Sequence, residues 1–104
     1  MSQVNITAGV CGFRTTIKAN SEDGQNVELE IISECPNYQQ LQNELKQVDA
    51  FEECFSKVGN GSVYHAFRQY CPHAACPVPC GVIKAIEVSA GLALPQDAVI
   101  EVHK

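Results

Sequence analysis

The sequence predicts an α+β fold in which about four helices pack on one face of a small antiparallel or mixed sheet. Two N-terminal segments alternate between apolar and polar residues, as strands do. Helical periodicity follows, and a short alternating segment ends the chain. The order is therefore strands, helices and one strand. Because no repeat or linker composition interrupts the 104 residues, we expect a single domain over residues 1–104.

An N-terminal β-hairpin is the first predicted unit. Residues 13–19 and 27–33 alternate with period two, and the turn-forming stretch 20–26 lies between them. A short strand is expected at 4–7, followed by a bulge or turn at 8–12, where two glycines permit conformations that other residues avoid. The sheet is thus expected to begin with consecutive antiparallel strands.

The register of this hairpin bears on two cysteines. If Ile17 faces Leu29, apolar residues pair with apolar residues on the buried side of the hairpin. The same register, extended toward the open end, sets Cys11 opposite Cys35 on the buried face. Their Cβ atoms would then lie roughly 5 Å apart.

Helical spacing of apolar residues predicts the middle of the chain. Pro36 suits a first helical position. The apolar residues of this first helix are Tyr38, Leu41, Leu45 and Val48. A second helix is expected at 49–57 with Phe51, Cys54 and Phe55 on one side, and Cys54 is interpreted as a core residue rather than a ligand.

Two more helices and a strand complete the predicted fold. The third helix is expected at 62–70 and the fourth at 81–90, with Gly91 placed to end it. The last strand is expected at 98–103, where Val99, Glu101 and His103 alternate with two apolar residues. This strand and the hairpin would make the sheet.

Residues 71–80 contain half of the six cysteines, one of the three histidines and three of the five prolines. Each proline removes a backbone donor and restricts the residue before it, so this stretch is expected to be a stiff loop rather than a helix or strand. A stiff loop with soft ligands loses less entropy when it binds a metal.

Charge and composition exclude several classes of function. The net charge of -5 with only seven Lys and Arg argues against nucleic acid as a partner, since such binding relies on clustered positive charge. No stretch approaches the ~20 apolar residues of a membrane span, and the N-terminus lacks the pattern of a signal peptide. We therefore expect a cytoplasmic protein with no membrane partner; a protein partner or a homo-oligomer stays open.

Six cysteines in a reducing compartment are expected to serve metals, redox chemistry or plain burial. A soft-metal site needs about four ligands. The preferred set is Cys11, Cys35, His73 and Cys76, with Cys71 and then Cys80 as substitutes. The spacing matches neither a zinc ribbon nor a ferredoxin, but ligand softness fits zinc or an iron–sulfur cluster and excludes calcium and magnesium. The expected function is a metal-binding protein with a structural, redox or sensing role.

Two other functions compete with metal binding. The first is a thiol-based redox enzyme or carrier that uses Cys76 or Cys35 as a thiolate. The second is an interaction module whose cysteines are buried and inert. No Gly-rich phosphate loop, nucleophile elbow or pair of catalytic carboxylates is present, so a binding protein is favoured over an enzyme.

Three motifs resemble a small prokaryotic domain family of anaerobes and methanogens that has no established activity. They are the C-G-F of residues 11–13, the S-x-C of residues 33–35 and the H-x-x-C-P-V-P of residues 73–79. The resemblance implies an anaerobic host and a shared metal or redox site on the residues that the pattern contains, Cys11, Cys35, His73 and Cys76. The cysteines outside this pattern are Cys54, Cys71 and Cys80.

Overall fold

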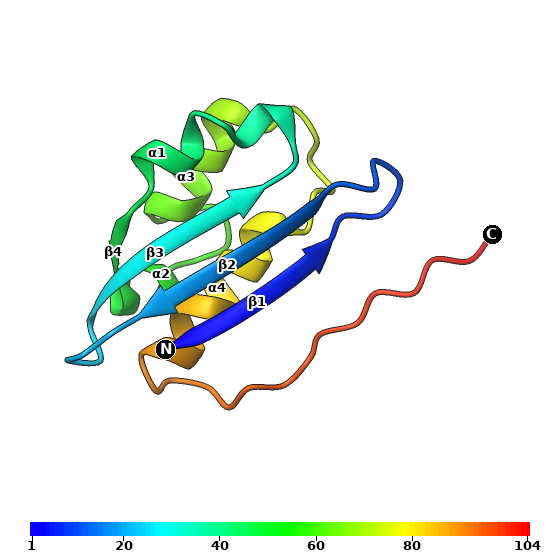
Figure 1. The fold of residues 1–104 in the computed structure, drawn as a ribbon. Helices are drawn as coiled ribbons and strands as arrows, with labels where there is room; N and C mark the ends of the chain where they lie inside the picture. Colours follow the sequence, from blue (N-terminus) through cyan, green and yellow to red (C-terminus); the bar gives the residue numbers. More distant parts are fainter.

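The computed structural model describes residues 1–104 and confirms the α+β class: a four-stranded antiparallel sheet carries the helices on one face (Figure 1). The strands occur in the sheet in their order along the chain. They are β1 (Ser2–Thr7), β2 (Arg14–Asn20), β3 (Asn26–Ser33) and β4 (Gln47–Asp49). The helices are the single 3-10 turn η1 (Pro36–Tyr38), α1 (Leu41–Glu44), α2 (Ala50–Phe55), α3 (Ser62–Tyr70) and α4 (Val78–Ser89).

The core lies between the sheet and the helices and contains sixteen buried hydrophobic residues. Helix α4 provides one layer of it because it packs against both β1 and β2. At its centre Ile17 of β2 and Val82 of α4 are completely buried. None of the helices has the length and apolar character needed to cross a lipid bilayer.

The predicted hairpin is present, but its register differs from the expected one by two residues. Ile17 pairs with Ile31, and Leu29 pairs with Ala19. A shift of two residues keeps every side chain on its predicted face because strands have period two. The expected pairing of Cys11 with Cys35 is nevertheless wrong, since Cys11 lies outside β2 in an exposed turn.

Residues 36–48 were expected to form one helix, and this expectation is wrong. The chain makes η1 and α1, and then leaves the helical conformation at Leu45, whose φ and ψ are -94° and 86°. Val48 belongs to β4, where it pairs with Val27 of β3. The fourth strand of the sheet therefore comes from the middle of the chain.

The expected C-terminal strand at residues 98–103 is absent. Residues 94–104 have no regular secondary structure and are exposed along their whole length. Figure 1 shows this segment leaving the end of α4 and running past β1, without joining the sheet.

Helix α4 begins earlier than expected, at Val78, so the predicted stiff loop is helical over its last three residues. Pro79 is compatible with this start because a first-turn N–H has no partner within the helix. Gly91 follows the helix with a φ of 75° and ends it as predicted. The other prolines of the loop precede α4.

The second and third helices occur where they were expected. Asp49 caps α2 by accepting hydrogen bonds from the N–H groups of Phe51 and Glu52. Phe51 and Phe55, however, are exposed, and Glu53 takes a buried position instead. Of the three residues expected on one side of α2, only Cys54 is partly buried.

Candidate functional site

Five of the six cysteines lie at one end of the molecule. The β1–β2 turn, the end of β3, the loop before α4 and the start of α4 meet there (Figure 1). Gly81 in the first turns of α4 lies against Ile6 near the end of β1. The cysteines at this end are Cys11, Cys35, Cys71, Cys76 and Cys80. Cys54 lies on α2, whose first N–H binds the carbonyl of Gln25 at the opposite end of the sheet.

Tyr38 brings two of these cysteines together. Its hydroxyl oxygen lies 2.8 Å from Sγ of Cys71 and 2.9 Å from Sγ of Cys76. The tyrosine is only 2% exposed, and its ring packs edge-on against Phe67 with centroids 4.9 Å apart. A fully buried hydroxyl needs a polar partner, and here both partners are sulfur atoms.

Counting protons orients the hydrogen bonds of this site. The Cys71 thiol donates to the backbone carbonyl of His73 over 3.3 Å, and the Tyr38 hydroxyl donates to the Cys71 sulfur. A tyrosine hydroxyl has a single proton. The contact between Tyr38 and Cys76 must therefore use the Cys76 thiol as the donor. The four groups form one chain that runs from Cys76 to the carbonyl of His73.

Burial favours the protonated forms of Tyr38 and Cys76. Removal from water raises the pKa of Tyr38 far above its usual range, and the contacts with Cys71 and Cys76 raise it further. Burial also raises the pKa of the Cys76 thiol, although the contact with Tyr38 opposes this effect. In the metal-free protein at neutral pH, Cys76 is accordingly a thiol and a weak nucleophile.

The remaining members of the expected ligand set lie nearby without joining this chain. Cys35 is half-buried and precedes η1, where its carbonyl accepts a hydrogen bond from the Tyr38 N–H over 3.1 Å. His73 is exposed, as are Cys11 in its turn and Cys80 in α4. No group of three or more His, Cys, Asp or Glu side chains is arranged to hold a metal ion. The structure thus brings Cys71 and Cys76 together, and the four-ligand set stays a prediction.

Sequence reasoning gave Tyr38 no role at the site and treated Cys71 only as a substitute. Tyr38 falls on an apolar periodicity, so the pattern assigned it to the core. The available signal was chemical: a tyrosine expected to be fully buried requires a partner for its hydroxyl. That partner could not be identified from spacing, because Cys71 and Cys76 follow Tyr38 by more than thirty residues.

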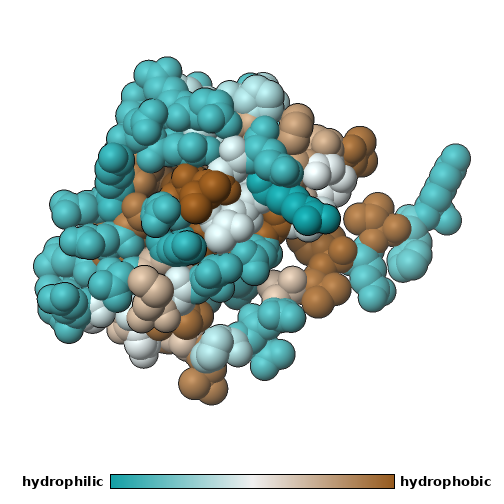
Figure 2. Space-filling view, in the orientation of Figure 1, coloured by the Kyte–Doolittle hydropathy of each residue, from teal (hydrophilic) through white to brown (hydrophobic).

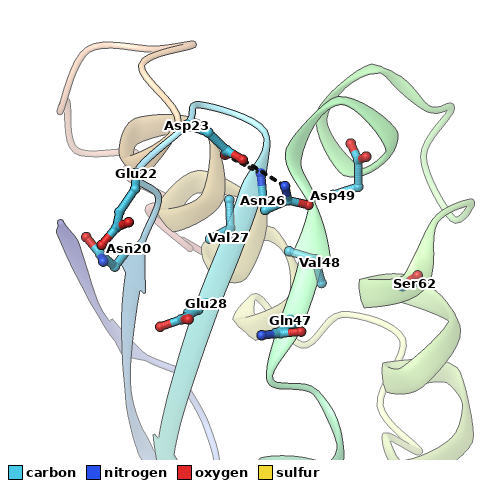
Figure 3. Close-up of a pocket in the computed structure, with 10 residues that line it drawn as sticks. All are labelled: Asn20, Glu22, Asp23, Asn26, Val27, Glu28, Gln47, Val48, Asp49 and Ser62. Atoms are coloured by element: carbon cyan, nitrogen blue, oxygen red, sulfur yellow. Dashed lines mark hydrogen bonds between the residues drawn. The ribbon is translucent and has the colours of Figure 1, made fainter.

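A cavity of about 510 Å³ lies at the other end of the sheet. It is lined mostly by polar side chains from the β2–β3 turn, β3, β4 and the start of α3 (Figure 3). Asp23 accepts hydrogen bonds there from the N–H and the side chain of Asn26. No cysteine or histidine lines this cavity, so it is separate from the sulfur-rich end.

Comparison with known proteins gives one result. No curated protein and no solved structure matches this chain. A family model does match residues 2–102, and the chain therefore belongs to the family of unknown function DUF6951, in agreement with the expectation of a family without established activity.

Proposed function

We propose that this protein is a small cytoplasmic metal-binding protein whose zinc or iron–sulfur site includes Cys71 and Cys76. The observation that supports this most strongly is the hydroxyl of Tyr38, which both sulfurs contact at 2.8 and 2.9 Å. Two soft donors from separate positions of the chain are thereby held beside the same atom. The role of the metal would be structural, redox or sensing.

The geometry of the pair suits a soft metal. Zinc binds thiolate sulfur at ~2.3 Å in a tetrahedral site, so neighbouring sulfur ligands lie only a few ångströms apart. The sulfurs of Cys71 and Cys76 are separated by no more than the sum of their distances to the Tyr38 oxygen. Both sulfurs are therefore near enough to be candidates for ligands of one ion.

Cys35 and His73 are the best candidates for the other ligands. Cys35 lies one 3-10 turn before Tyr38, and His73 lies in the short loop between the paired cysteines. Cys11 is a weaker candidate than the sequence suggested, because its expected place opposite Cys35 is wrong. Cys80 stays a substitute at the same end of the molecule.

Anaerobic purification followed by metal analysis tests this proposal. We expect close to one zinc ion per chain without colour, or iron and sulfide with visible absorption that changes on reduction or exposure to air. The double variant Cys71→Ser/Cys76→Ser should lose the metal. Cys54→Ser is the matched control, because Cys54 lies at the other end of the sheet and should leave the metal content unchanged.

Unchanged metal content in the double variant would contradict the proposal. If the double variant binds as much zinc or iron as the wild type, with equal affinity on reconstitution, the paired cysteines are not ligands and the proposal is wrong.

The proximity of Cys71 and Cys76, whose sulfurs both contact the Tyr38 hydroxyl, also favours a second candidate, a dithiol carrier. In an exchange with a disulfide of a partner protein, the two thiols would form one disulfide and the partner would gain two thiols, so that protons and electrons balance. The raised pKa of Cys76 lowers its thiolate fraction and so slows this attack at neutral pH. Incubation of metal-free protein with oxidised glutathione separates the two: rapid formation of an intramolecular Cys71–Cys76 disulfide would favour the carrier.

A further inference from the structure

The exposed C-terminal segment, residues 94–104, has the pattern of a strand but no partner. Its large apolar side chains are almost fully exposed, with Val99 at 75%, Ile100 at 80% and Val102 at 87%. Figure 2 shows hydrophobic surface continuing along this segment away from the body of the molecule. Ala98, Ile100 and Val102 share one side of an extended chain, and the other side carries Val99, Glu101 and His103. Such a segment is an amphipathic strand that lacks a sheet.

The sheet has a free edge of matching length. Strand β1 pairs only with β2, and the opposite edge strand β4 contains just three residues. The N–H of Ala8 binds the carbonyl of Phe13 at the end of the β1–β2 ladder. Antiparallel pairs alternate between bonded and non-bonded, so Gln3, Asn5 and Thr7 direct their N–H and C=O groups to the free edge. These groups are a template for another strand.

The core is also incomplete at this edge. Ile17 and Ile31, on the helix-facing side of β2 and β3, are 0% and 3% exposed. Val4 and Ile6, on the same side of β1, are only partly buried. A strand added beside β1 would cover them with Ala98, Ile100 and Val102, while its mixed side, with Glu101 and His103, would continue the solvent-exposed face of the sheet.

From these observations we propose that residues 98–103 of one chain add to the β1 edge of a second copy, and that the exchange is reciprocal. Each chain of the dimer gives its C-terminal segment to the β1 edge of the other chain. A two-fold symmetric dimer therefore leaves no C-terminal segment and no β1 edge unpaired. The interaction is strand addition, in which backbone hydrogen bonds and alternate apolar side chains both contribute.

The path of the chain favours a second copy over the chain's own edge. The end of α4 lies where β1 begins, because Ser2 Oγ donates to the carbonyl of Ala85 over 2.7 Å. A segment that leaves α4 there and folds back on its own β1 would have to run parallel to it (Figure 1). Parallel pairing is slightly weaker than antiparallel pairing, and every other pair in this sheet is antiparallel. A partner related by a two-fold axis is free to pair antiparallel.

Light scattering on the eluting protein during size-exclusion chromatography tests the proposal directly. The full chain should elute with twice the mass of the single chain and should dissociate on dilution. Ile100→Asp should raise the dimer dissociation constant by about 30-fold or more, because it places a charge on the buried side of the added strand. Val99→Asp is the matched control on the opposite side and should leave the dimer intact.

The edge has its own pair of variants. Asn5→Pro removes an N–H that faces the free edge and leaves the bonds between β1 and β2 in place, so it should give a folded monomer. Asn5→Ala keeps the N–H and should remain a dimer. Circular dichroism confirms that each variant is folded.

Three outcomes would overturn the exchange. The first is a wild-type chain that is monomeric at every concentration. The second is a dimer that neither Ile100→Asp nor Asn5→Pro weakens. The third is a monomer in which the amides of Ala98 to Val102 exchange slowly with solvent, since the segment would then occupy its own edge. None of these measurements depends on the metal.

Discussion

Two buried polar side chains, Tyr38 and Glu53, find their partners in different ways. The Tyr38 hydroxyl uses two sulfur atoms. The Glu53 carboxylate accepts hydrogen bonds from the N–H groups of Ser62 and Val63, at 2.7 and 3.2 Å, and so caps the start of α3. No buried side-chain nitrogen or oxygen lacks a partner. Removing the partners of either residue would therefore leave a buried polar group without a hydrogen bond and would lower the free energy of unfolding.

Replacing Tyr38 by phenylalanine should lower the free energy of unfolding of the metal-free protein by about 1 kcal/mol. The ring and its packing are kept, and only the hydrogen bonds of the hydroxyl are lost. Urea denaturation measures the change. Tyr70→Phe is the control, because its hydroxyl bond to Glu44 lies at the surface and should contribute less. Equal losses in the two variants would mean that the buried sulfur contacts contribute no more to stability than a surface hydrogen bond.

Glu53 should make stability depend on pH in an unusual direction for a carboxylate. Burial raises its pKa, although the Val63 and Ser62 amides oppose this, so the native state holds the proton more tightly than the unfolded chain. The contribution of protonated Glu53 to the free energy of unfolding is fully present below the ordinary glutamate pKa. It is lost as the pH rises through the raised pKa of the native state. Relative to Glu53→Gln, wild-type stability should therefore fall as the pH rises above the ordinary glutamate pKa of about 4.3. Urea titrations of both proteins from about pH 4 upward measure the difference in free energy of unfolding. A wild-type stability that rises with pH relative to Glu53→Gln would contradict the prediction.

Part of the site could be predicted from residues alone. The sequence placed Cys35 and Cys76 among the soft ligands, and both lie at the sulfur-rich end. It expected Cys54 to be a core residue, and burial raises the pKa of that thiol to about 11. The contact of Cys71 with Tyr38 depends on how η1 and α3 pack, which no local pattern encodes.

The close contact between α4 and β1 depends on a glycine. A Cβ at Gly81 would overlap Cδ1 of Ile6 and would lie 2.8 Å from its Cγ1. Glycine within a helix costs about 1 kcal/mol relative to alanine. We infer that the close packing of α4 on β1, which alanine would disturb, offsets this penalty. The strand and the helix are closer here than an ordinary side chain allows.

Gly81→Ala should lower the free energy of unfolding by about 1 kcal/mol or more, because Ile6 must move. In an Ile6→Ala background the same change should be neutral or stabilising, since the obstacle is gone and the helix propensity remains. A double-mutant cycle by urea denaturation measures this reversal. If Gly81→Ala stabilises the wild-type background, Ile6 accommodates the methyl group without cost.

The predicted elements failed where a strand or helix depends on distant partners. Alternation located the hairpin, but a shift of two residues preserves the faces, so alternation could not fix the register. The turn fixes it, with Asp23 accepting from the N–H groups of Gln25 and Asn26. Residues 36–48 showed helical spacing, yet pairing with β3 makes a strand of Gln47–Asp49. Residues 98–103 have the alternating pattern of a strand, but they pair with no strand of the sheet.

The whole molecule has a compact body and an extended tail. The body contains all sixteen core residues, the last of which is Ile86. Residues 94–104 contribute nothing to that core. The fold should therefore be independent of the tail, whatever the tail binds.

Removing residues 94–104 should leave the unfolding midpoint unchanged at high dilution. At high protein concentration the full chain should gain stability from reciprocal exchange, while the truncated chain should not. Thermal unfolding over a dilution series measures both effects. A truncated chain that is less stable at high dilution would show that the tail supports its own body.

The hydroxyl of Tyr38 also provides an optical reporter. The chain has three tyrosines and no tryptophan, so its near-ultraviolet absorbance comes mainly from these three tyrosines. One of them touches both sulfurs of the proposed site. Arrival of an ion or oxidation of the sulfurs should thus change tyrosine absorbance and fluorescence without any attached label.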